Sequence, residues 1–244
     1  MLSDDQLLRY SRQLVLSELD LVGQTKLLES RVLVVGAGGL GCPLVLYLAS
    51  SGIGYITIID HDVVEAHNLP RQVLFDERDL GHKKALVVAE KLTRQYPDSD
   101  IDAITLKLTA ASQVPESHFD LIIDATDTPS VGAVLNTYSI NRQVPLLYMA
   151  AVAMEGRLFF ARGYDTNKPC LQCYLGGAAD PLGGCHTLGV LAPAVGAIAL
   201  LGATQAIRSL LGDPPEGLTC LDAWGLNTLK LQLTKRDECS ACGH

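Results

Sequence analysis

Hydrophobic and polar positions between residues 31 and 150 follow two alternating periods. Short runs of β-branched and aliphatic residues, which are typical of buried strands, occur at VLVV, YITII, IDAITL, DLIIDA and VPLLYMA. Longer segments with helical periodicity separate them, namely GLGCPLVLYLASS, HKKALVVAEKLTRQY and VGAVLNTYSINRQ. This succession of strands and helices predicts an α/β fold with a doubly wound, mainly parallel sheet.

The N-terminal residues predict a separate amphipathic helix. Ser3 and Gln6 form a capping-box pattern at the start of the segment DDQLLRYSRQLVL. On a helix of that length, Arg9 and Arg12 lie three residues apart and therefore on one face.

The pattern changes after residue 150. The segment EGRLFFARGY leads to a glycine-rich passage, an apolar helix near 190–211 and two strand-like runs around 218–233, which we expect to be antiparallel. No linker-like boundary is visible. We therefore expect residues 1–244 to form a single domain with a flexible loop at about 175–189.

Composition and net charge indicate which kinds of molecule the protein is expected to bind. Hydrophobic residues make up 48% of the 244-residue chain, and the formal net charge is -8 without any basic block. A surface for nucleic acid or for an anionic membrane is therefore not expected. A small molecule or another protein is the favoured partner.

Neither export nor a membrane span is predicted. The N-terminus MLSDDQLLRY is acidic and lacks an apolar signal region. The most apolar stretch, VLAPAVGAIALLGA, reaches Thr204, Gln205 and Arg208 before it is long enough to span a bilayer, so it predicts a buried helix. The expected compartment is the cytoplasm.

A glycine-rich turn follows the first strand of the α/β region. GAGGLG opens a helix, and Asp60 ends the next strand, which is the arrangement of a Rossmann-like nucleotide site. Glycines let backbone N–H groups approach phosphate oxygens, and a carboxylate at the second strand accepts hydrogen bonds from a ribose. The pattern therefore indicates a nucleotide, without specifying a nicotinamide.

A polar segment, NLPRQVLFDERDLGHKKA, follows Asp60. It contains Asn68 and Arg71, and a helix that begins near Gly81 brings Lys84 after them. Two cations beside a phosphate site suit a triphosphate with a highly charged leaving group. Without the glycine turn, the same two cations would be read as ordinary surface charges.

Two aspartates lie at the end of the strand in LIIDATDTPS. Asp124 ends the strand and Asp127 follows it, at the edge where ligands of such sheets bind. A carboxylate there can bind a Mg²⁺ ion that bridges phosphate oxygens. Helix capping ahead of Pro129 is an equally good interpretation of these residues.

Four of the seven cysteines form two CxxC pairs, Cys170 with Cys173 and Cys239 with Cys242. Each pair has the spacing of a zinc knuckle, and two knuckles make a closed site of four thiolates. We therefore predict a structural zinc ion that ties the end of the chain to the sheet.

One further cysteine has the features of a reactive thiol. Cys185 lies in DPLGGCHTLG beside a histidine, where a thiolate could attack an activated acyl group. An incidental loop cysteine fits the sequence equally well.

Taken together, RYSRQ, GAGGLG, IIDHDVVEAHNLPRQ, GHKKA, DATD, the two CxxC pairs and CHTLGVLAP resemble the ThiF/MoeB/HesA family of bacterial adenylyltransferases, which are relatives of the ubiquitin-activating enzymes. The resemblance runs from about residue 9 to residue 242. Within the family, AAVAMEGRLFF is more similar to members of the molybdopterin pathway than to members of the thiamine pathway.

The resemblance implies the roles of individual residues. ATP is expected to bind to Gly38, Gly39, Asp60, Asp62, His67, Asn68, Arg71, Lys84, Asp127 and Thr128. The implied catalytic residues are Arg12, Arg71, Lys84, Asp127 and Cys185, with Asp127 handling Mg²⁺. Arg12 matches an arginine that reaches the active site of a partner subunit in this family, so the resemblance also implies a homodimer.

The implied reaction is adenylylation of the C-terminal glycine carboxylate of a ubiquitin-like sulfur carrier that ends in Gly-Gly. A separate sulfur donor, such as a cysteine desulfurase or a rhodanese, would then replace AMP. The chain departs from the family pattern at Thr128, where asparagine is usual, and at Pro70, where glutamine is usual.

Four alternatives stay open at this point. Within the family, these are the thiamine-pathway adenylyltransferase and a tRNA-modifying dehydratase, and the absence of a basic patch disfavours the latter. From other classes, an NAD(P)-dependent oxidoreductase shares the glycine turn, and a non-catalytic scaffold would only bind a nucleotide or a carrier.

Overall fold

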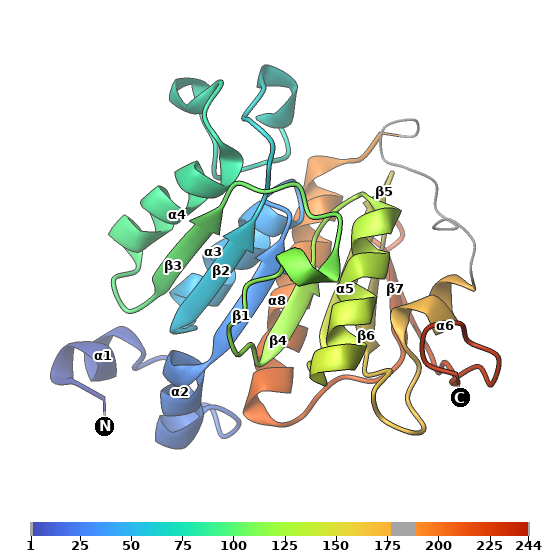
Figure 1. Ribbon diagram of the computed structural model, residues 1–244. Coiled ribbons are helices and arrows are strands. Elements are labelled where there is room, and N and C mark those ends of the chain that lie inside the picture. The colour runs from blue at the N-terminus through green and yellow to red at the C-terminus, as the bar shows by residue number, and fades with distance from the viewer. Residues whose placement is uncertain (1, 177–188, 244) are drawn as a thin grey trace.

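The computed structural model describes residues 2–176 and 189–243 (Figure 1). Within these ranges eight strands form one sheet in the order β3-β2-β1-β4-β5-β6-β7-β8. Their bounds are β1 Arg31–Val35, β2 Tyr55–Ile59, β3 Asp100–Ile104, β4 Leu121–Asp124, β5 Leu146–Val152, β6 Glu155–Ala161, β7 Leu218–Asp222 and β8 Asn227–Leu231.

The first five strands are parallel, as their continuous hydrophobic runs predict. In register, Val34 pairs with Ile58 of β2 and Ile123 of β4. Because neighbouring residues of a strand point to opposite faces, Val34 belongs to one hydrophobic core and Leu33 to another. The sheet is therefore buried on both sides.

Helices cover both faces of the sheet. The helices are α1 Asp4–Arg9, α2 Asp20–Glu29, α3 Gly41–Ser50, α4 Lys84–Gln95, α5 Pro129–Arg142, α6 Leu171–Leu175 and α8 Ala192–Leu211, with 3-10 turns η1 Ala66–Asn68, η2 Glu77–Asp79 and η3 Ala111–Gln113. Side chains of α2, α3, α4 and α8 form one core, and those of α5 and α6 contribute to the other. The predicted doubly wound α/β fold is confirmed.

The C-terminal strands are antiparallel, as expected. β6, β7 and β8 continue the sheet beyond β5 by successive antiparallel pairs. The two runs around 218–233 are β7 and β8, whereas the hydrophobic pattern had not assigned EGRLFFARGY, which forms β6, to a strand. Most of the glycine-rich passage lies outside the described residues, so the flexible loop at 175–189 stays a prediction.

The predicted apolar helix is α8. By length and composition alone it could cross a membrane, a test that core helices also pass. One face of α8 packs in the core, where a Cβ at Gly202 would lie 2.4 Å from the sulfur of Met149 on β5. This packing accounts for the apolar residues on the buried face of the helix.

The N-terminal helix is much shorter than predicted. The capping box of Ser3 and Gln6 is present, but α1 ends at Arg9, and the chain continues through turns to α2. Tyr10 explains the difference, because its side chain is buried against the body of the protein and its backbone leaves the helical conformation. Arg9 and Arg12 therefore do not share a helical face.

A close backbone contact directs the chain from β1 into α3. A Cβ at Gly41, the first residue of α3, would lie only 1.9 Å from the carbonyl oxygen of Gly36, and Gly36 itself has a φ of 99°. No side chain fits at position 41, and the backbone conformation at position 36 favours glycine. Helix and strand can thus approach each other as a nucleotide-binding turn requires.

We expect Gly41→Ala to lower the free energy of unfolding by about 1–3 kcal/mol, because the clash is with backbone that cannot rotate away. Urea denaturation with a fluorescence or circular-dichroism readout measures this change. Gly196→Ala on α8 is the matched control: its Cβ meets nothing within 4 Å, so the helix should gain about 0.5–1 kcal/mol. Equal midpoints for the two variants would contradict the proposed constraint.

Candidate functional site

A cleft of about 740 Å³ opens at the carboxyl edge of the parallel strands. It lies where the chain connections leave β1 and β4 toward opposite faces of the sheet, which is the usual ligand site of doubly wound folds. All ten residues expected to bind ATP line it: Gly38, Gly39, Asp60, Asp62, His67, Asn68, Arg71, Lys84, Asp127 and Thr128. The fold thus brings together segments that are far apart in the sequence.

Asp60 fixes the glycine turn. One of its carboxylate oxygens accepts a 2.7 Å hydrogen bond from the backbone N–H of Ala37, and the other accepts a 2.8 Å bond from the N–H of Asp62. Each carboxylate oxygen has more than one acceptor site, so Asp60 keeps capacity for a ribose hydroxyl. The residue therefore shapes the turn and still faces the cleft.

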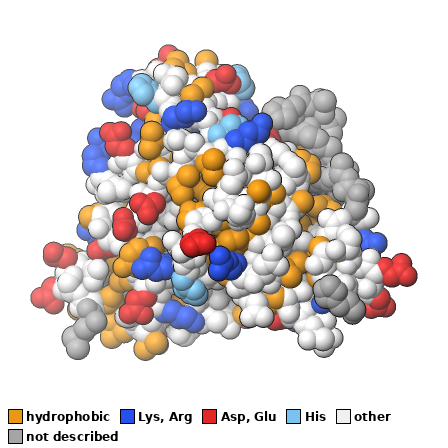
Figure 2. Space-filling model, viewed as in Figure 1, with side chains coloured by type: hydrophobic (Ala, Val, Ile, Leu, Met, Phe, Trp, Pro, Cys, Tyr) orange, Lys and Arg blue, Asp and Glu red, His pale blue; other side chains and the backbone are white. Residues whose placement is uncertain are grey.

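Two cations reach the cleft from the segment that follows β2. Lys84 is buried at the start of α4, with its Nζ 3.1 Å from the Asp62 carboxylate. Arg71 is half-buried, and its Nη1 donates a 2.8 Å hydrogen bond to the carbonyl oxygen of His67. Figure 2 shows Lys, Arg and His side chains gathered over this segment, at the top of the molecule.

Asn68 supports this segment from within. The side chain is buried, and its Oδ1 accepts a 3.2 Å hydrogen bond from the N–H of Glu65. This bond closes the 3-10 turn η1, which carries His67 and leads to Arg71. Asn68 thus has a structural contact in addition to its place in the cleft.

The loop after β4 brings carboxylates to the other side of the cleft. Asp124 is fully buried, and burial raises its pKa to about 7. The hydroxyl and N–H of Thr126 donate hydrogen bonds to it, which oppose the shift, whereas the charge of Asp127 adds to it. Asp127 itself is exposed at the cleft, so it is the better placed of the two for a metal-bound phosphate.

The capping interpretation of this loop is not supported. Thr128, not an aspartate, occupies the N-cap position of α5, and Pro129 follows it at the first helical position. The Thr128 hydroxyl donates a 3.3 Å hydrogen bond to Asp127. The departure from the family pattern at Thr128 therefore retains a polar contact to the adjacent carboxylate.

Sequence reasoning missed several cleft residues. Lys107 and Tyr148 line the cleft, and so does Gln72, whose buried Oε1 lacks a hydrogen-bond partner within the described residues. Lys107 could have been found, because it follows β3 at the edge where the strands end. Gln72 lies in the NLPRQ motif, but the burial of its side chain depends on the fold and could not be predicted from that motif.

Arg12, one of the expected catalytic residues, does not join the cleft of its own chain. Arg12 is exposed, is not among the lining residues, and has no hydrogen bond or ion pair to any other described residue. Cys185 lies outside the described residues. The structure thus tests neither role.

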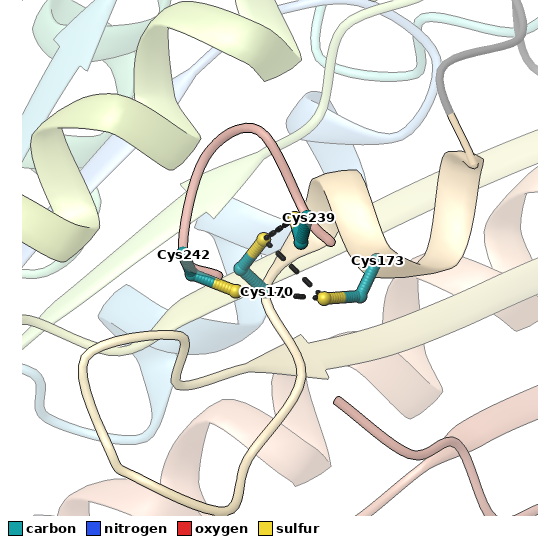
Figure 3. A group of neighbouring side chains, drawn as sticks. All are labelled: Cys170, Cys173, Cys239 and Cys242. Atoms are coloured by element: carbon teal, nitrogen blue, oxygen red, sulfur yellow. Dashed lines mark hydrogen bonds between the residues drawn. The ribbon is translucent and has the colours of Figure 1, made fainter. Parts of the chain in front are cut away.

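The four CxxC cysteines meet in one buried cluster (Figure 3), and none of them lines the cleft. Sulfur atoms of Cys170 and Cys239 lie 3.6 Å apart, and those of Cys173 and Cys242 lie 3.5 Å apart. Four thiolates around a zinc ion at about 2.3 Å are separated by about 3.8 Å, so the donor set fits tetrahedral zinc. These separations are too long for disulfides.

The remaining described cysteines differ in burial. Cys42 is in the core, and burial raises the pKa of its thiol to about 12. Cys220 on β7 is only half-buried and packs against the edge of one core. Its apolar neighbours in the sequence belong to an outer hairpin of the sheet, which helices cover less completely.

Comparison with known proteins relates the whole chain to one family. Residues 10–241 match the ThiF family. The chain is 36% identical over 246 residues to the molybdopterin-synthase adenylyltransferase of Escherichia coli, covering 99% of this chain and 98% of that protein. It is 34% identical over 245 residues to the sulfur carrier protein ThiS adenylyltransferase of the same organism, with coverage of 99% and 97%.

A solved structure agrees with the fold. The crystal structure of E. coli MccB with ATP superimposes with a TM-score of 0.82 over 97% of this chain and 75% of that one, at 24% identity. This likeness shows a shared architecture. With the match over residues 10–241, it leads to one conclusion: the chain belongs to the ThiF family.

Proposed function

We propose that this protein is an adenylyltransferase that uses ATP to activate the C-terminal glycine carboxylate of a small ubiquitin-like sulfur carrier. One observation carries the proposal: the glycine turn, two cations and an exposed carboxylate line the same cleft. An NAD(P)-dependent oxidoreductase has no need of that combination. The adenylyltransferase names of the full-length relatives support the same reaction class.

Each part of the cleft has a proposed task toward ATP. Gly38 and Gly39 lie in the turn just before α3, and backbone N–H groups and the helix dipole at this end of the helix favour phosphate. Asp60 accepts from the ribose, and Lys84 and Arg71 neutralise the triphosphate. Asp127 would bind Mg²⁺, which supplies charge neutralisation at the phosphates.

The proposed step forms one bond and breaks one. An oxygen of the carrier's terminal carboxylate attacks the α-phosphorus of ATP, and the bond from that phosphorus to the bridging oxygen of pyrophosphate breaks. The products are a carrier acyl-adenylate and pyrophosphate. A carboxylate needs no general base, so positioning by the cleft and neutralisation by Lys84 and Arg71 are the main contributions of the protein.

The proposed setting is molybdenum cofactor biosynthesis, in the cytoplasm, where a separate sulfur donor such as a cysteine desulfurase or a rhodanese would displace AMP. The thiamine-pathway relative is almost as similar in sequence and is the second candidate. The identity of the Gly-Gly carrier that the protein binds decides between them.

We propose that the enzyme acts as a homodimer with Arg12 in the partner's active site. Large hydrophobic side chains are exposed on both sides of Arg12 in the sequence, including Leu8 at 78%, Val15 at 80% and Val22 at 75%. Exposed apolar surface of this kind is typical of a protein interface.

Asp127→Ala should abolish carrier-dependent exchange between ATP and labelled pyrophosphate, with a loss of at least about 100-fold. The reason is that the variant removes an exposed carboxylate beside the phosphates without disturbing the core. Thr128→Asn, which restores the usual family residue, is the control and should keep near-normal exchange. Near-normal exchange by Asp127→Ala at saturating Mg²⁺ would show that this role is wrong.

Cys173→Ser should release zinc and lower the thermal midpoint. A loss of about 2–3 kcal/mol corresponds to about 5–10 °C in a chain of this size. Metal analysis under reducing conditions should find one zinc per chain in the wild type. Cys220→Ser, which removes a half-buried thiol outside the cluster, should change neither quantity. Substoichiometric zinc in the wild type would contradict the assignment.

Arg12→Ala and Asp127→Ala should each be nearly inactive, but mixing the two proteins should restore activity. After full subunit exchange, half of the dimers are mixed, and each mixed dimer has one site with both groups intact. The expected exchange rate is about one quarter of the wild-type value. No recovery despite demonstrated subunit exchange would place Arg12 outside the partner's site.

A further inference from the structure

The N-terminal arm, residues 2–18, has little contact of its own with the core. Tyr10 is the only buried residue in this range, and α1 has none. An exposed segment of this kind keeps a defined position only where specific contacts fix it. The contacts that fix the arm are therefore informative, because Arg12 lies within it.

Asp98, which follows α4, receives three donors from the arm. Its Oδ1 accepts a 3.1 Å hydrogen bond from Nε2 of Gln6, and its Oδ2 accepts a 3.1 Å bond from the Tyr10 hydroxyl. The Arg9 Nε lies 3.0 Å from the same Oδ2. One carboxylate thus binds three side chains that are about 90 residues earlier in the chain.

The body of the protein is shaped to receive Tyr10. Gly52 has a φ of 85°, and a Cβ there would lie 2.8 Å from Cζ of the tyrosine ring. Beyond Tyr10, Nε2 of Gln13 donates hydrogen bonds to Oε1 of Gln24 at 3.2 Å and to the carbonyl oxygen of Ser51 at 3.4 Å. The arm therefore has two anchors, Tyr10 with Asp98 and Gln13 with Gln24.

Arg12 lies between these two anchors. Its backbone position is set on both sides, while its side chain is exposed and has no polar contact to the other described residues. This is the arrangement expected of a cation that is presented to another molecule. In contrast, the side chain of Arg9, three residues earlier, forms an ion pair with Asp98.

We propose that Asp98 is a positioning residue: it fixes the N-terminal arm so that Arg12 is presented to the cleft of a second copy of this chain. The proposal rests on the proposed function, in which Arg12 acts in the partner's site. Asp98 would therefore act, like Arg12, on the cleft of the partner. It lies in the loop after α4, whereas the first residue of α4, Lys84, lines the cleft of its own chain.

The test is a complementation experiment with carrier-dependent pyrophosphate exchange as the readout. Asp98→Ala should reduce exchange by about tenfold, because a misplaced arginine is poorly aligned with the triphosphate. Mixing Asp98→Ala with the inactive Asp127→Ala protein should then raise activity to about 2.75 times that of Asp98→Ala alone, because mixed dimers combine an intact arm with an intact cleft.

Mixing Asp98→Ala with Arg12→Ala should instead lower activity to about half that of Asp98→Ala alone, since both arms are then defective. A residue that merely stabilises its own subunit would not show this pattern. Asp102→Ala is the matched control, because Asp102 is an exposed aspartate of β3 without a side-chain contact to the described residues, and it should behave as wild type.

Milder variants keep the test decisive where Asp98→Ala fails to fold. Tyr10→Phe removes only the hydroxyl that Asp98 binds, and Asp98→Asn keeps an acceptor but loses the charge that pairs with Arg9. Both should lose less exchange activity than Asp98→Ala. Like Arg12→Ala, both should regain activity when mixed with Asp127→Ala. The proposal would be overturned if mixing with Asp127→Ala restored activity to Arg12→Ala but to none of the Asp98 and Tyr10 variants. Failure of the Arg12 pair itself would overturn the shared site of the proposed function, and the role of Asp98 with it.

Discussion

The contact between the backbones of Gly36 and Gly41 determines where the chemistry of this protein takes place. The two residues approach so closely that a side chain at Gly41 would overlap the carbonyl oxygen of Gly36. The carboxylate of Asp60, which follows β2, accepts a hydrogen bond from the backbone N–H of Ala37 in the same turn. Because β1 lies in the middle of the parallel strands, this turn stands at the centre of the carboxyl edge. The segments after β2 and β4 can then approach one ligand from its two sides.

Helix α5 connects this cleft with the cysteine cluster. Its N-terminus follows Asp127, and at Gly132 an added Cβ would lie 3.1 Å from an oxygen of Asp124 and 3.2 Å from a carbon of Leu171 on α6. One turn later, Oδ1 of Asn136 accepts a 2.8 Å hydrogen bond from the N–H of Leu171. A metal bound by the four thiolates would therefore fix α6, and through it the helix that begins at the acidic loop. A structural metal can thus stabilise the position of cleft residues without contacting the molecule that binds in the cleft.

Much of the fold and of the cleft could be predicted from the sequence, because the informative signals are local. A hydrophobic run followed by a polar residue marks the carboxyl end of a parallel strand, and all such ends meet at one edge. Asp60 and Asp127 were found in this way. The CxxC pairs are equally local, since each knuckle is formed by neighbouring residues. The two pairs are 69 residues apart in the chain, and they meet in one cluster with the ligand set of a structural zinc site.

The N-terminal arm could not be predicted, because what ends its helix lies elsewhere in the chain. The capping box and the periodicity of residues 4–16 favour one continuous helix, and nothing within that segment opposes it. Burial of Tyr10 against Gly52 and its hydrogen bond to Asp98 outweigh that preference, but both partners are more than 40 residues away. Helix propensity amounts to a few tenths of a kcal/mol per residue, whereas burying an aromatic side chain contributes about 2–3 kcal/mol. A tertiary contact of that size decides the local conformation, and it also separates the residues of the motif RYSRQ. The first arginine, the tyrosine and the glutamine attach the arm, whereas the exposed side chain of Arg12 has no such contact to the other described residues.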